Sequence, residues 1–123
     1  MAAQALIETF RDNADSTIRR HALIEATREP LSAAQKLVDL LEIVVMAEPS
    51  VRQSVASDLF GGVELVQGAF VAVMMAIEHN LGQDEVEDLD VLTHQDRANL
   101  WCRHDVAIAA LKPSLRVRER PCL

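Results

Sequence analysis

One segment, residues 59–81, constrains the fold of this chain more than any other. In its first nineteen residues only Glu64 and Gln67 interrupt a run of apolar residues and glycines. Residues with little bulk recur at every fourth position of this run, which places them on one face of an α-helix. These residues are Gly68, Ala72 and Ala76. Because the backbone of another helix can come close to such a face, the segment predicts a central helix surrounded by other helices.

The composition agrees with an all-helical fold. Half of the 123 residues are hydrophobic, but the chain has only three Phe, one Trp and no Tyr, so its core is aliphatic. A mixture rich in Ala and Leu suits helices. We expect an all-α protein built as an antiparallel bundle of four helices, or of five if the helix breaks at Gly61-Gly62.

Prolines and capping patterns divide the chain into these helices. The apolar spacing predicts a first helix over residues 2–28, which ends before Pro30. The alternative is a break at residues 12–16, because Asp, Asn and Ser favour caps and turns. Capping-box patterns begin at Ser32, Ser50 and Thr93. They open helices that end before Pro49, at Gly82 and before Pro113, respectively. We therefore expect one helical domain over residues 1–112.

Charge is unevenly distributed. The net charge of −7 includes an acidic segment, residues 83–92, whose carboxylates repel one another and predict a solvated loop. Residues 113–123 are basic and predict an irregular tail. The overall negative charge argues against bulk attraction to nucleic acid.

The sequence also contains features that predict where in the cell the protein resides. Residues 59–77 contain polar side chains and a Gly-Gly pair, which argues against a membrane span. The first sixteen residues lack the pattern of a signal peptide. The two cysteines, Cys102 and Cys122, show no disulfide framework, so we expect a cytoplasmic protein with no membrane partner.

Histidines provide the candidate chemistry. His21 and His104 fall within apolar stripes, where an imidazole is unexpected. If their helices share a core, these rings and the nearby Glu25 and His79 could form a metal or ligand site. The alternative is that each ring has an ordinary hydrogen-bonding partner, which is the commoner situation for buried polar groups.

No specific signature supports an enzyme or a cofactor. The chain lacks HExxH, CxxC and the Glu-x-x-His pattern of di-iron bundles. No cofactor is expected, and the primary interpretation is a non-enzymatic protein. The alternative is a bundle that binds a small molecule or a metal, with an enzyme among its possible forms.

The remaining inference concerns association. Residues 32–47 and 59–81 show more apolar circumference than one neighbouring helix can cover. We therefore expect a helical interaction module that binds a second copy of itself, as a homodimer, or another helical protein. The candidate interface or close-packing residues are Gly68, Ala72, Ala76, Leu41, Val44 and Val45.

Overall fold

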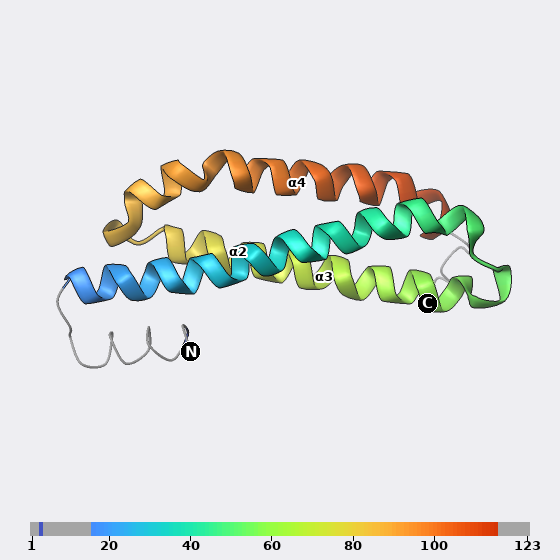
Figure 1. The fold of residues 1–123 in the computed structure, drawn as a ribbon, viewed down its shortest axis with the longest axis horizontal. Coiled ribbons are helices and arrows are strands. Elements are labelled where there is room, and N and C mark those ends of the chain that lie inside the picture. Colours follow the sequence, from blue (N-terminus) through green and yellow to red (C-terminus); the bar gives the residue numbers. More distant parts are fainter. Residues whose placement is uncertain (1–2, 4–15, 116–123) are drawn as a thin grey trace, which may run out of the picture.

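The computed structural model describes residue 3 and residues 16–115, and within this part of the chain the fold is an up-down-up arrangement of three long helices (Figure 1). These are α2 (Ser16–Ala47), α3 (Ala56–Leu81) and α4 (Glu87–Leu115). Short 3-10 turns cover Glu48–Ser50, Gln53–Val55 and Asp84–Val86. The described residues contain no strand, so the all-α prediction is confirmed, whereas a bundle of four or five helices is wrong.

The first difference lies at Pro30. Helix α2 continues through this residue, so the expected separation of residues 2–28 from 32–47 is wrong within the described part. Proline has no N–H, and the carbonyl oxygen four residues earlier, on Ala26, loses its helical donor. The side-chain amide of Asn80 in α3 donates to that oxygen at 3.3 Å. A contact from another helix thus satisfies the group that the proline leaves open.

Helix α3 is continuous through Gly61-Gly62, where a break was possible. It begins at Ala56, so the expected start at Ser50 is wrong: 3-10 turns cover Glu48–Ser50 and Gln53–Val55. Its end at Gly82 agrees with the prediction: the Gly82 N–H donates to the carbonyl oxygen of Glu78 at 3.2 Å.

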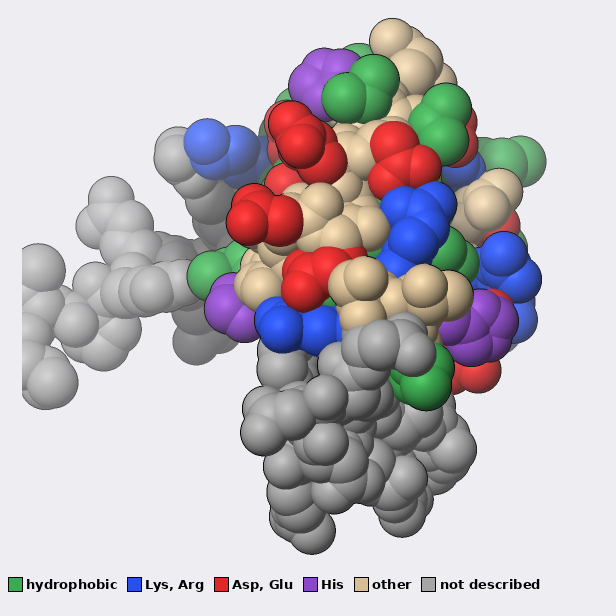
Figure 2. Space-filling model, turned by 90° about the vertical axis from the view of Figure 1, so that its left-hand side faces the viewer, with side chains coloured by type: hydrophobic (Ala, Val, Ile, Leu, Met, Phe, Trp, Pro, Cys, Tyr) green, Lys and Arg blue, Asp and Glu red, His purple; other side chains and the backbone are tan. Residues whose placement is uncertain are grey.

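The acidic segment is helical from Glu87, so the expected loop over residues 83–92 is wrong. Carboxylates in the first turn of a helix interact favourably with its dipole. Arginines at the start of α2 also compensate them: Arg19 pairs with Glu85 at 3.0 Å and Arg20 with Asp88 at 2.6 Å. Figure 2 shows this end of the molecule, where acidic and basic side chains are interspersed.

Helix α4 also passes through its proline, Pro113, and reaches Leu115. The irregular tail expected over residues 113–123 is therefore wrong for residues 113–115, and residues 116–123 lie outside the described residues. Residues 4–15 of the expected first helix also lie outside them.

The core consists of two groups of buried side chains. The larger lies towards the turn between α3 and α4 and contains Leu23, Ala34, Val38, Phe70, Met74, Ile77, Leu81, Val86 and Leu100. The smaller lies towards the other end and contains Leu41, Val63, Ala107 and Leu111. All three helices contribute to both groups, so α2 packs against α3 and α4 along its length.

One stretch, Gln53–Leu81, is long and apolar enough to cross a membrane by length and composition. Core helices of soluble proteins meet the same criterion, but only 22% of the most apolar part of this stretch is buried in the protein.

Candidate functional site

The most unusual surface of the molecule is the side of α3 that faces away from α2 and α4. Leu65 is 78% exposed and Met75 is 65% exposed on this side. Helical spacing places them beside exposed residues of small volume, and we call the whole set the outer face of α3. It consists of Leu65, Gly68, Ala69, Ala72, Met75 and Ala76, with Glu64 and His79 at its two ends.

The structure separates the predicted interface residues into two sets. Gly68, Ala72 and Ala76 are exposed on the outer face of α3. Leu41, by contrast, is buried in the smaller core group, and Val44 and Val45 pack against that group. These three residues of α2 therefore belong to the core of the monomer.

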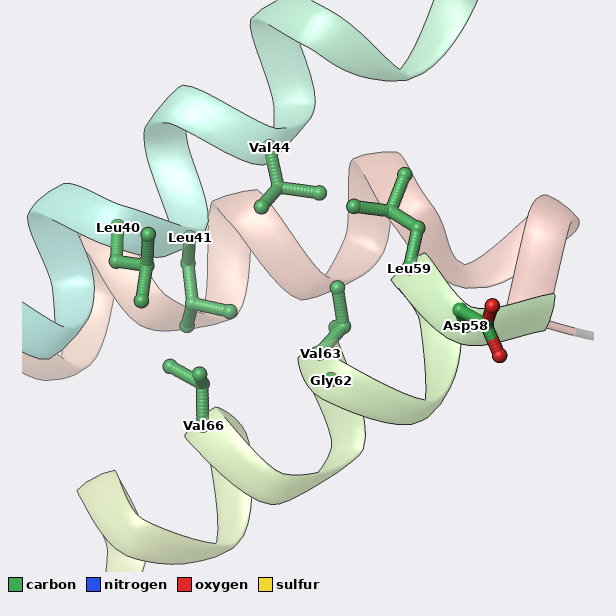
Figure 3. A pocket seen from close by; sticks show the side chains of 8 residues that line it. All are labelled: Leu40, Leu41, Val44, Asp58, Leu59, Gly62, Val63 and Val66. Atoms are coloured by element: carbon green, nitrogen blue, oxygen red, sulfur yellow. The ribbon is translucent and has the colours of Figure 1, made fainter. Parts of the chain in front are cut away.

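A cavity of about 240 Å³ opens between the end of α2 and the start of α3 (Figure 3). Its lining is aliphatic apart from one carboxylate, that of Asp58, at the edge in Figure 3. Gly62 leaves part of this space empty, because nothing lies within 4 Å of the position that a Cβ would take. The lining residues are Leu40, Leu41, Val44, Asp58, Leu59, Gly62, Val63 and Val66.

His104 is the one buried histidine among the described residues, with 5% of its surface exposed. Its ring stacks on Phe70 with centroids 4.7 Å apart, and Trp101 meets both rings edge-on. Nδ1 lies 2.9 Å from a carboxylate oxygen of Asp105. Because a carboxylate accepts, Nδ1 is the donor in this contact, and in the tautomer that carries its proton there Nε2 is an acceptor. No described residue donates to this buried Nε2.

The other predicted ligands do not join His104. His21 on α2 and His79 on α3 are exposed, and Glu25 lies 3.4 Å from Arg28 in an ion pair on its own helix. Within the described residues no three side chains of His, Cys, Asp or Glu lie close enough together to hold a metal ion.

Arginine residues connect the helices, and sequence reasoning did not identify them. Arg97 on α4 is buried, with 7% of its side chain exposed. It lies 2.5 Å from Glu78 on α3 and 2.5 Å from Asp90 on its own helix. The spacing of Asp90, Thr93 and Arg97 along one helical face was an available signal, since Arg97 also donates to the Thr93 hydroxyl.

Two further arginines shift the pKa of their partners. The Arg103 guanidinium donates to Glu42 and Asp39 of α2, and its hydrogen bond to Glu42 lowers the pKa of that carboxyl group. The hydrogen bond from Arg20 likewise lowers the pKa of Asp88. In both pairs the charged form of the acid is favoured because a cation donates to it.

Comparison with known proteins gives one result. The model of the family described as formiminotransferase-cyclodeaminase matches residues 2–98. No curated protein and no solved structure matches significantly. The matched range includes all of α3 and ends before Trp101 and His104. Because this range covers more than three quarters of the sequence, the chain belongs to the formiminotransferase-cyclodeaminase family.

Proposed function

We propose that this chain is a helical association domain of an enzyme-related family, and that it forms a homodimer through the outer face of α3. The supporting observation is the exposure of Leu65 and Met75 on a face that carries no charged side chain between Glu64 and Glu78. Contiguous apolar surface of this kind is uncommon on monomers and marks interaction sites.

The physical argument concerns burial. Each large apolar side chain removed from water contributes about 1.5–3 kcal/mol. The residues around Leu65 and Met75 have little volume, so a partner helix can approach to about 8 Å between axes. The face is therefore shaped for a helix. The proposal also places the protein in the cytoplasm, and the support for this is that Cys102 is exposed and unpaired.

The mass of the protein in solution tests this function. We expect light scattering coupled to size-exclusion chromatography to give a dimer whose fraction rises with concentration. Ala72→Glu places a charge in the middle of the outer face and should give a monomer. Ala98→Glu is the matched control, because Ala98 is exposed on α4. A monomeric wild-type protein up to millimolar concentration would contradict the proposal.

A second candidate function is small-molecule binding, with cyclodeaminase activity as its enzymatic form. The family match favours it, as does the buried Nε2 of His104, which is free to accept a hydrogen bond from a ligand. The test is ammonia release from formimino compounds by the wild-type protein and by His104→Leu. Release that the variant loses while it remains folded supports this candidate, and no release above the buffer rate counts against it. Thermal unfolding at increasing zinc concentrations tests whether the protein binds a metal ion.

A further inference from the structure

Charge and side-chain size vary along the outer face of α3. The face therefore fits a parallel and an antiparallel partner helix differently. Glu64 lies at its N-terminal end and His79 lies fifteen residues later at its C-terminal end, and both are exposed. Between them lie two large side chains and four small ones. Leu65 and Met75 are large, whereas Gly68, Ala69, Ala72 and Ala76 are small.

We infer that the partner on this face is α3 of a second copy, antiparallel to the first and crossing it at Ala72, so that Glu64 of each copy meets His79 of the other. The inference rests on the proposed function, since it requires that the outer face of α3 is the dimer interface. It adds the direction and the register of the two helices.

Charge complementarity supports the antiparallel direction. With a two-fold axis at Ala72, residues whose numbers add up to about 144 face each other. Glu64 then lies near His79 at both ends of the interface. A carboxylate attracts a protonated imidazole and accepts a hydrogen bond from a neutral one. A parallel dimer in register would bring Glu64 against Glu64. It would also align the two helix dipoles, which the antiparallel arrangement sets in opposite directions.

Side-chain volume supports the same register. In the antiparallel arrangement Met75 lies opposite Ala69, and Gly68 lies opposite Ala76. The large Met75 then meets a small side chain, as in well-packed helix pairs, and Leu65 lies against the His79 end of the partner helix. In a parallel dimer Met75 would meet Met75 and Leu65 would meet Leu65. These pairs of large side chains would hold the two helices apart, and the small Gly68 and Ala76 would leave the space between the helices empty.

The dimensions of the face set the expected strength. A face of sixteen residues is about 24 Å long at the standard rise per residue. Two such helices crossing at about 20° remain in contact over this length, but they bury less surface than the roughly 800 Å² per partner of a standard interface. We therefore expect a reversible dimer with a dissociation constant in the micromolar range.

Disulfide cross-linking measures the direction. The background is the full chain with Cys102→Ser and Cys122→Ser, and the oxidant is oxidised glutathione. Ala72→Cys should form a covalent dimer with itself. Gly68→Cys alone should not, because its two copies lie about 12 Å apart along the axes. An equimolar mixture of Gly68→Cys and Ala76→Cys should give the mixed dimer. Ala98→Cys on α4 is the control that stays monomeric.

Charge reversal provides an independent readout. Glu64→Lys should raise the dissociation constant about 3-fold to 10-fold. The double variant Glu64→Lys/His79→Glu should restore it, since the new charges are again opposite. Glu29→Lys, on an exposed position of α2, should leave it unchanged.

The results separate the two proposals. A dimer in which Gly68→Cys cross-links with itself is parallel, and it overturns the inference but not the proposed function. A monomer at every concentration overturns both. Flotation of the monomer with phosphatidylcholine vesicles would show that lipid covers the face, and it also overturns both. If the protein is a dimer but none of the α3 cysteines forms a cross-link, the interface lies elsewhere, and both proposals are overturned.

Discussion

The side-chain amide of Asn80 donates to the carbonyl oxygen of Ala26 at 3.3 Å, and that oxygen is the acceptor that Pro30 leaves without a helical donor. The contact joins α3 to the middle of α2 and explains how α2 remains one helix. Asn80 lies in the last turn of α3.

This relationship predicts coupling between Asn80 and Pro30. Asn80→Ala should reduce the free energy of unfolding by about 1–2 kcal/mol, because it leaves a partly buried carbonyl without a donor. In a Pro30→Ala background the N–H of residue 30 supplies the donor, so the same substitution should cost less than about 0.5 kcal/mol. Urea unfolding of the four proteins measures the cycle. Gln83→Ala removes an exposed amide contact of the same helix end and serves as the control. Equal costs in both backgrounds would contradict the explanation.

Arg97 predicts an asymmetry between removing a buried cation and removing its partners. Glu78→Gln with Asp90→Asn leaves the guanidinium buried without a counter-charge and should cost about 3 kcal/mol. Arg97→Met replaces the charge with an apolar side chain of similar length and should cost about 1 kcal/mol or less, because the half-exposed carboxylates can be hydrated. Chemical denaturation of both variants provides the comparison. The reverse order of costs would show that Arg97 is not effectively buried.

Acid should weaken the contacts between α2 and α4. The pKa values of Glu42 and Asp88 are lower in the folded protein than in the unfolded chain, so the unfolded chain binds protons at higher pH. Their contribution is complete above the unfolded pKa of about 4 and is lost as the pH falls through the lower folded value. Arg103→Gln and Arg20→Gln should each flatten this acid dependence. Urea midpoints between pH 7 and pH 3 measure it, and parallel curves for variants and wild type would refute it.

The two adjacent glycines of α3 predict a gain in stability. Nothing lies within 4 Å of a Cβ added at Gly61 or Gly62, so alanine at either position adds helix propensity without a clash. Each substitution should raise the free energy of unfolding by about 0.5–1 kcal/mol. Thermal unfolding measures the gain, with Gly82→Ala as a comparison in which the new Cβ would lie 3.4 Å from the His79 carbonyl oxygen. A loss of stability at Gly61 would show that this stretch of α3 requires glycine.

Local sequence patterns correctly predicted the all-α class and the end of α3 at Gly82. They failed where a distant residue compensates a local cost. Pro30 ends a helix by the local rule, and the residue that overrides this rule, Asn80, lies fifty-four positions away. The carboxylates after Gly82 repel one another in isolation, but Arg19 and Arg20 from the start of α2 neutralise two of them. Such pairings depend on which helices become neighbours, and periodicity does not give that information.

The candidate site likewise combines features that local patterns predicted with features that depend on the packing of the helices. The spacing of Gly68, Ala72 and Ala76 correctly placed them on one helical face, but it did not indicate that this face points outward. Apolar stripes suggested that both His21 and His104 belong to a core, yet only His104 is buried. The burial of His104 depends on Phe70, a residue of another helix that stacks on its ring.

The contact between Asn80 and Ala26 also bears on the order in which the chain acquires its structure. During synthesis the ribosome releases residues 16–47 well before Asn80 emerges. Until then the Ala26 carbonyl has only water as its donor, and the nascent segment has no reason to stay straight across the proline. The donor that completes α2 at its proline therefore arrives only when the end of α3 docks against it.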